Sequence, residues 1–214
     1  MNLELHHFFI LVKPEAKVAE RLLALGMQES PGRIHAGQGT ANRLFHFLNG
    51  TLELLWVHDA AEAENGPGHD LCFAQRTGNP AASPFGVLFN RKDNASLAMP
   101  FTGWHYQPDY FQPPQGFHVG ANSTNVLEPL CIYMPFIEPA PAGKDTMDGI
   151  FKNITEVQIA TPSQPMSDVL RIANSADRLS IASADEHLMD ITFDNHQQGR
   201  TEDLRPGMPL IIHW

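Results

Sequence analysis

The first 25 residues change from the pattern of a buried strand to that of an amphipathic helix. Residues 3–12 are rich in Phe, Ile, Leu and Val and alternate only imperfectly, which is typical of a strand buried on both faces. Residues 15–25 place apolar side chains on one helical face. Pro14 suits the first turn of that helix and Gly26 suits its end. The pattern therefore predicts a strand followed by a short helix.

A hairpin is the clearest feature of the residues that follow. A short strand is expected at 27–29, before a Pro-Gly turn. Asn49 and Gly50 then separate two apolar runs within 42–57, and both residue types accept the positive φ of a type I′ turn. Residues 1–57 therefore predict a β-α-β-β-β module.

The middle of the chain carries a weaker copy of this pattern. Residues 58–84 lack a sustained period and predict a connector with a short helical piece at 71–76. Residues 85–136 predict a degraded second module that contains an aromatic, proline-rich loop at 104–114. Its elements are expected as strands at 85–91, 116–121 and 130–136, with a short, poorly helical stretch at 93–99.

The last part of the chain returns to the first pattern. Residues 137–149 have the composition of a linker, and 150–214 predict a C-terminal β-α-β-β-β module. Its elements are expected as a strand at 154–160, a helix at 166–175 and strands at 179–184, 188–193 and 209–213. The predicted fold class is therefore α+β, with repeated modules whose curved mixed sheets enclose a cleft.

Composition narrows the classes of partner. The 214 residues carry a formal net charge of −10 without a basic run, so nucleic acid and an anionic membrane are poor partners. No apolar run is long enough for a transmembrane helix, and the N-terminus lacks the features of a signal peptide. Cys72 and Cys131 show no metal-binding spacing and predict buried free thiols in a reducing compartment. A cytoplasmic protein with a small-molecule ligand is expected.

An imidazole and a carboxylate on neighbouring strands are the strongest candidates for chemistry. Glu53 stands in an apolar strand, where an ionised carboxylate needs a cation, a histidine or several hydrogen-bond donors. His6 and His7 lie on the opening strand, where alternation places one in the cleft and the other towards helices or solvent. Two alternatives stay open: a packing role for the histidines, and a cross-strand ion pair between Glu53 and Arg43.

A second candidate group lies at the entry to the hairpin. His35 is a candidate general acid or base. Thr40 and Asn42 are candidates for substrate binding, or alternatively for bonds to loop amides. Gly37 and Gly39 allow the backbone between them to approach a ligand closely.

The proline-spaced aromatic residues of the middle unit predict the wall or lid of a pocket. Trp104, Tyr106 and Phe117 are the candidates for substrate contacts. His105, in the same stretch, is a second candidate for proton transfer.

Several segments, in this order, carry a family resemblance across most of the chain. The most specific runs from His35 through Gly39, Thr40 and Asn42 to Arg43. The others are Leu5-His6-His7-Phe-Phe-Ile, the Leu25-Gly26 helix end, Leu-Glu53-Leu-Leu, Pro84-Phe85-Gly86 and Glu128-Pro129-Leu130. Together they resemble the glyoxalase-like domain proteins of the vicinal oxygen chelate (glyoxalase/bleomycin resistance/dioxygenase) superfamily.

The resemblance implies a divalent metal ion held by the first and fourth strands of two modules. Carried over by position, His7 and Glu53 are the metal ligands, and zinc, nickel, manganese or iron(II) all suit such donors. Three protein ligands are usual, and His105 or His118 is a guess for the third. The positions that correspond to His7 and Glu53 in the other two units are Gly86–Val87, Ile132–Tyr133, Thr155–Glu156 and Ile211–Ile212. Among these, only Glu156 is a credible ligand.

Two functions remain open at this stage. The resemblance implies a small-molecule enzyme, a metal-dependent lyase, isomerase or dioxygenase, in which the metal chelates substrate oxygens and stabilises an enolate or alkoxide. The alternative is a metal-free protein of the same fold that binds or sequesters an apolar small molecule, while a purely structural role ranks below both. Modules of this type often pair between chains, so a homodimer is a further expectation.

Overall fold

The computed structural model describes residues 2–139 and 148–214, so residues 140–147 of the expected linker lie outside the described part. The first nine strands are β1 (Glu4–Leu11), β2 (Glu29–Ser30), β3 (Ile34–His35), β4 (Thr40–Phe47), β5 (Gly50–Val57), β6 (Phe85–Asn90), β7 (Gly103–Tyr106), β8 (Phe117–Gly120) and β9 (Leu130–Tyr133). The last five are β10 (Ile154–Thr161), β11 (Leu179–Ser183), β12 (Leu188–Phe193), β13 (Thr201–Asp203) and β14 (Leu210–His213). The α-helices are α1 (Ala19–Ala24), α2 (Ala60–Asn65), α3 (Phe73–Gly78) and α4 (Asp168–Ala173), and 3-10 turns lie at Pro14–Ala16, His69–Leu71, Ala121–Thr124 and Asp194–His196.

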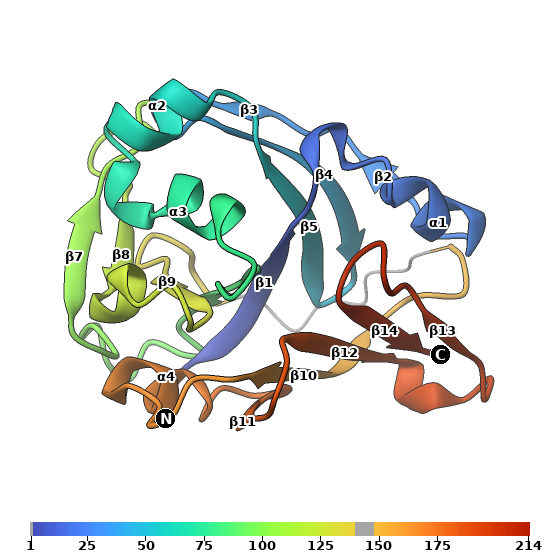
Figure 1. The fold of residues 1–214 in the computed structure, drawn as a ribbon. Helices are drawn as coiled ribbons and strands as arrows, with labels where there is room; N and C mark the ends of the chain where they lie inside the picture. Colours follow the sequence, from blue (N-terminus) through green and yellow to red (C-terminus); the bar gives the residue numbers. More distant parts are fainter. Residues whose placement is uncertain (1, 140–147) are drawn as a thin grey trace.

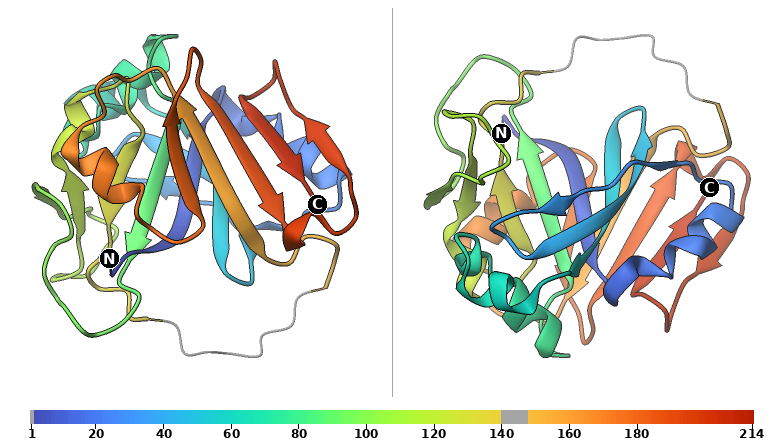
Figure 2. Two further views of the ribbon diagram at one scale, coloured as in Figure 1. Left: turned by 90° about the horizontal axis from the view of Figure 1, so that it is seen from below. Right: turned by 90° about the horizontal axis from the view of Figure 1, so that it is seen from above.

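These strands form two mixed sheets that pack against each other (Figures 1 and 2). The first sheet has the order β2-β4-β5-β1-β6-β9-β8-β7, with β3 paired to β4. It contains two modules of one design, because β1 is parallel to β5 in the first and β6 is parallel to β9 in the second. The modules join where β1 and β6 pair antiparallel. This confirms the predicted α+β fold with repeated modules and curved mixed sheets.

The third unit has the expected element types but another strand order. Its sheet runs β11-β10-β12-β14-β13, with β10 parallel to β11 and antiparallel to β12. In the first two modules the opening strand instead pairs in parallel with the closing strand. The order differs because the chain returns from α4 directly to the edge of β10, and β13 adds a strand that the sequence pattern did not predict.

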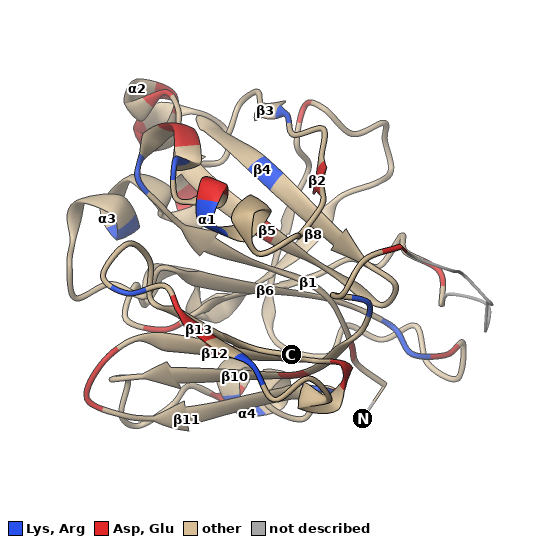
Figure 3. Cartoon of the chain, turned by 90° about the vertical axis from the view of Figure 1, so that its right-hand side faces the viewer, with Lys and Arg blue, Asp and Glu red and all other residues tan. Residues whose placement is uncertain are grey.

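One apolar layer joins the two sheets. Phe8, Phe45 and Phe89 enter it from the first sheet and Ile191 and Phe193 from β12, and all five are fully buried. Figure 3 shows β10–β13 from the side, as a layer below β1 and β6. The second sheet thus covers one face of the first and leaves the other face available for a cavity.

Several short elements differ from the sequence-based expectations. Helix α2 lies in the segment interpreted as a connector, and β7 lies within the predicted aromatic loop. Residues 93–99 form irregular bends, since they lack the apolar periodicity that holds a short helix against a core. Both cysteines are buried free thiols, as predicted. In the described part of the chain, no helix has the length and apolar character needed to cross a membrane.

Candidate functional site

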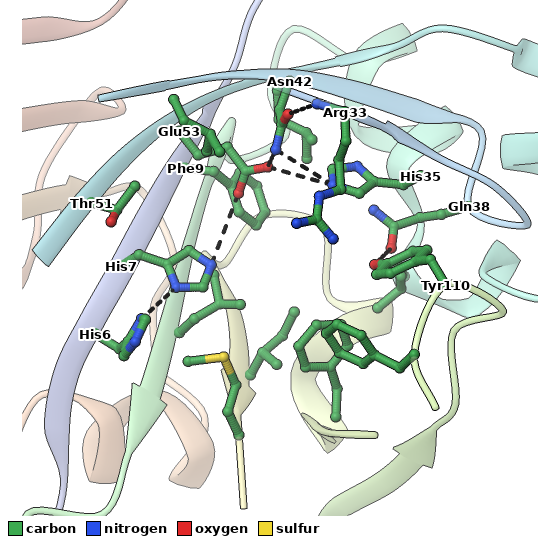
Figure 4. Close-up of a pocket in the computed structure, with 18 of the residues that line it drawn as sticks. His6, His7, Phe9, Arg33, His35, Gln38, Asn42, Thr51, Glu53 and Tyr110 are labelled. Atoms are coloured by element: carbon green, nitrogen blue, oxygen red, sulfur yellow. Dashed lines mark hydrogen bonds and ion pairs between the residues drawn. The ribbon is translucent and has the colours of Figure 1, made fainter. Parts of the chain in front are cut away.

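A cavity of about 320 Å³ lies on the face of the first sheet that the second sheet leaves uncovered (Figure 4). One end is polar and belongs to the first module, chiefly His7, Arg33, His35, Asn42 and Glu53. The rest of the lining is mostly apolar and includes Phe9, which lies beside Glu53, and Phe73, Phe111, Phe117, Ile132 and Phe136. The cavity therefore has the size and the mixed lining of a site for a small organic molecule.

Strand alternation turns Glu53 into this cavity. Thr51 and Leu55 line it with Glu53, whereas Leu52 and Leu54 face the apolar layer between the sheets. Glu53 is 7% exposed. Burial raises the pKa of its carboxyl from 4.5 to about 7, although the hydrogen bond from Asn42 acts in the opposite direction. The carboxyl thus changes charge near neutral pH, which suits a group that accepts and returns a proton.

His7 faces the same carboxyl group from β1. Its Nε2 lies 4.0 Å from Glu53 Oε2, so the two side chains meet in the cavity as the sequence predicts (Figure 4). Burial lowers the pKa of His7 to about 3, and the imidazole is therefore neutral at pH 7.

His6 also lines the cavity, contrary to the expected alternation. The pairing of β1 with β6 shifts register between Leu5 and His7, which makes His6 the extra residue of a β-bulge. Its Nδ1 lies 2.9 Å from Nδ1 of His7. The expectation that one histidine points away was wrong because the bulge arises from the pairing of two distant strands, which the pattern of β1 alone does not reveal.

Asn42 connects three parts of the polar end. Its Nδ2 donates a hydrogen bond to Glu53 Oε1 at 2.6 Å and lies 3.4 Å from His35 Nε2. Its Oδ1 accepts a hydrogen bond from the backbone N–H of Arg33 at 2.7 Å. This buried amide therefore fixes one oxygen of Glu53 and leaves Oε2 facing the cavity.

His35 is a second neutral imidazole beside the carboxyl group. Its Nε2 lies 4.0 Å from Glu53 Oε1, and burial lowers its pKa to about 4. Its Nδ1 lies 2.9 Å from Thr40 Oγ1, which also accepts a hydrogen bond from Gln38 Nε2 at 2.8 Å. Thr40 is fully buried and does not line the cavity, so it orients His35 instead of contacting a ligand.

Helix α2 holds the loop that carries His35. The carboxylate of Glu62 accepts hydrogen bonds from the backbone N–H groups of Gly37 and Gly39, each at 2.9 Å. Gly39 has a φ of +69°, and a Cβ there would lie 2.3 Å from the backbone nitrogen of Ala63. Only glycine fits this close approach of loop and helix.

Arg43, the alternative partner of Glu53, lies on the other face of the hairpin. The register pairs Arg43 with Leu54 and Glu53 with Leu44, so the two side chains point to opposite sides. Arg43 forms ion pairs with Glu20 and Glu29 instead. The proposed cross-strand pair was therefore wrong.

The predicted aromatic wall is present in part. Phe117 lines the cavity, with Tyr110 and Phe111 from the loop before it. The hydroxyl of Tyr110 donates a hydrogen bond to Gln38 Oε1 at 3.2 Å, which ties this loop to the first module.

Other residues of that stretch lie away from the cavity. Trp104 Nε1 donates a hydrogen bond to Ser123 Oγ, and Tyr106 is buried beside Phe117 without lining the cavity. His105 is exposed on β7, an edge strand, and does not line the cavity. The structure therefore does not bring His105 to the other candidate residues, because alternation on β7 turns Tyr106 into the core and His105 to the opposite, exposed face.

The predicted metal ligands do not form a complete set. His7 Nε2 and Glu53 Oε2 are close enough to share one ion at ordinary metal–ligand distances. Among the described residues, however, no group of three or more His, Cys, Asp or Glu side chains is placed to hold one. The Asn42 amide nitrogen, which cannot ligate, lies between Glu53 Oε1 and His35 Nε2. Two donors fall short of the usual three, so this donor set does not fit a resident zinc, nickel, manganese or iron ion.

Sequence reasoning missed three polar residues of the cavity. They are Arg33, Gln38 and His46. A signal existed for His46, because residues an even number of positions apart on one strand share a face. His46 stands four positions after Asn42 on β4, whereas Arg33 lies before the two-residue strand β3.

The comparisons with known proteins define the fold and not the reaction. No family model matches the chain, and no curated protein matches it. A hypothetical protein from Staphylococcus aureus has a similar structure, with a TM-score of 0.59, 11% identity and coverage of 99% of each chain. A methylmalonyl-CoA epimerase from Mycobacterium tuberculosis matches with a TM-score of 0.40 and 14% identity, over 64% of this chain and 89% of that one. The three-unit architecture of this chain is thus similar, over nearly its full length, to that of the Staphylococcus aureus protein.

Proposed function

We propose that this chain is a small-molecule enzyme with a glyoxalase-like fold that moves a proton on a carbon acid, with Glu53 as the base. The observation that carries this proposal is the buried carboxyl group with a pKa raised to about 7. One of its oxygens is held by Asn42, and the other faces the cavity. A base with a pKa near the working pH transfers protons most efficiently.

The proposed reaction uses only the chain's own groups. Glu53 Oε2 takes a proton from a substrate carbon next to a carbonyl group, the C–H bond breaks, and its electron pair moves to the carbonyl oxygen as an enolate. Return of the proton to another face or another atom gives an isomer. His7, kept neutral by burial, offers an uncharged N–H donor to the developing oxyanion.

A metal-free binding protein is the second candidate function. The incomplete donor set and the apolar end of the cavity favour it. The two functions differ in one observable, because an enzyme exchanges a proton of its ligand with water and a binding protein does not.

Hydrogen–deuterium exchange separates the two. A panel of small carbonyl compounds is incubated with the protein in deuterium oxide, and exchange at the carbon next to the carbonyl is followed by NMR. We expect exchange of at least one compound, with a rate that rises with pH through about 7, and a loss of about 100-fold or more in Glu53→Gln. Glu156→Gln, an exposed strand carboxylate of the third unit, is the control and is expected to leave the rate unchanged.

A variant of Asn42, which positions Glu53, adds a test of the pH dependence. Since the hydrogen bond from Asn42 lowers the pKa of Glu53, Asn42→Ala is expected to move the pH–rate limb to higher pH. Compounds that bind without exchange would replace the enzyme proposal with the binding function. Exchange that persists in Glu53→Gln would overturn the assignment of Glu53 as the base.

A further inference from the structure

Arg33 places a permanent positive charge in the cavity. Among the described residues that line it, Arg33 is the only arginine or lysine. Its guanidinium points into the cavity beside His35 (Figure 4). Within residues 2–139 and 148–214, this guanidinium makes no hydrogen bond or ion pair with the protein, whereas Arg43 pairs with Glu20 and Glu29. Arg33, an exposed residue, thus brings to the cavity a cation that forms no direct ion pair among the described residues, although its charge lowers the pKa of Glu53.

The position of this cation is tied to that of the base. Asn42 accepts a hydrogen bond from the backbone N–H of Arg33 and donates one to Glu53 Oε1. One amide therefore holds the backbone of Arg33 beside Glu53, and both side chains line the same cavity. This arrangement suits a ligand whose charged group lies a few bonds from its reacting carbon.

We propose that Arg33 binds the carboxylate of a small organic acid whose apolar, ring-sized tail lies against the phenylalanines at the other end of the cavity. A planar guanidinium matches a carboxylate with two parallel hydrogen bonds. The rings of Phe111, Phe117 and Phe136 are neighbours, with centroids 5.1 to 6.2 Å apart, and give the tail an aromatic surface. The assignment of the reacting carbon to Glu53 rests on the proposed function, whereas the binding of the carboxylate does not.

Two probes of nearly equal shape test whether the cavity prefers a negatively charged ligand. Phenylacetate and phenylacetamide differ in charge, and their binding is measured by isothermal titration calorimetry. We expect the protein to bind phenylacetate about tenfold or more tightly than phenylacetamide, since charge-assisted hydrogen bonds are the stronger ones. Arg33→Gln is expected to abolish this preference while changing the affinity for phenylacetamide little. Arg171→Gln removes one charge from α4, far from the cavity lining, and is expected to keep the preference.

Other outcomes separate this inference from the proposed function. Equal affinity for both probes, no binding of either at millimolar concentration, or a preference that survives Arg33→Gln would overturn it. Competition by inorganic phosphate as effective as that by phenylacetate would also overturn it, because the site would then select anionic charge without the tail. Glu53→Gln is expected to keep the preference for phenylacetate while abolishing proton exchange, so a failure of the reaction leaves the binding result intact.

Discussion

Glu53 is held in surroundings that favour its protonated form. It accepts one strong hydrogen bond from Asn42, but its nearest imidazoles, His7 and His35, are neutral and provide no counter-charge. A buried carboxyl group without a paired cation costs stability when it ionises. The same feature that makes Glu53 suitable as a base therefore makes it a source of instability at alkaline pH.

The stability cost gives a prediction with a definite sign. Burial raises the pKa of Glu53 from 4.5 to about 7, so between these values the folded chain keeps a proton that the unfolded chain has released. Its contribution to stability is present below pH 4.5 and is lost as the pH rises through 7. Glu53→Gln cannot ionise and is expected to be more stable than the natural chain at pH 8, by up to about 3 kcal/mol.

Urea unfolding at pH 8 and pH 4.5 measures this difference. The two proteins are expected to differ at pH 8 and to converge at pH 4.5, where both side chains are neutral in the folded state. Glu156→Gln, on an exposed strand position, controls for the general loss of one negative charge. A Glu53→Gln variant that is less stable at both pH values would show that the carboxylate is stabilised in the folded state.

At the scale of elements, α2 positions the loop between β3 and β4. Glu62 on this helix accepts two hydrogen bonds from that loop, at Gly37 and Gly39. We expect Glu62→Ala to lower the free energy of unfolding by about 2 kcal/mol, because two backbone donors lose a charged acceptor. It is also expected to slow proton exchange, since the loop carries His35 into the site. Urea unfolding and the exchange assay measure the two effects.

Glu64→Ala, on the same helix, is the matched control. Its side chain is exposed and lies outside this network, so it is expected to change stability by less than about 0.5 kcal/mol. Equal effects of the two variants would mean that α2 does not hold the loop through Glu62.

The elements that the sequence predicted are those with a local signal. The hairpin of β4 and β5 was predicted from Asn49-Gly50, and the direction of Glu53 follows from alternation within one strand. The predicted turn was wrong in detail: Leu48 and Asn49 form the turn, Gly50 already belongs to β5, and neither Asn49 nor Gly50 has the positive φ of a type I′ turn. The bulge at His6 was not predictable, because it depends on how β1 pairs with β6, a strand that begins far along the chain at Phe85. Helix α2 and strand β7 lack sustained apolar periods, so tertiary contacts decide their conformation.

The candidate site likewise contains residues that the sequence predicted and residues that it missed. His7, Glu53, His35 and Asn42 were chosen from residue type and order, and the structure brings all four to one cavity. Arg33 was missed because it precedes a two-residue strand, where no period marks a face. His105 was included because its neighbours are aromatic, a property that does not reveal to which face of the sheet its side chain points.

At the scale of the whole molecule, a buried carboxylate of the second module accepts hydrogen bonds from the third unit. Glu128 is fully buried beside β9. Its Oε1 accepts hydrogen bonds from Ser163 Oγ and the Ser167 N–H, and its Oε2 accepts bonds from Ser167 Oγ and Asn122 Nδ2. These four donors come from both sides of the junction, so they lose their acceptor together when it is removed.

Replacing this carboxylate should weaken the entire fold. We expect Glu128→Ala to lower the free energy of unfolding by about 3–5 kcal/mol, because buried donors are left without partners. Glu128→Gln keeps one oxygen acceptor and is expected to lose less. Urea unfolding followed by circular dichroism measures both, and Glu186→Ala, an exposed residue of the third unit, is the control. An Ala variant as stable as this control would show that the junction depends on its apolar contacts alone.

The apolar layer shared by the two sheets has a practical consequence. Phe8 of β1 and Phe193 of β12 lie in one continuous core, so we expect both sheets to melt in a single transition. Any compound that binds in the cavity then raises the melting temperature of the entire chain. A dye-based melting screen of a chemical library therefore offers a route to the natural ligand, because its readout is the same whichever reaction the cavity supports.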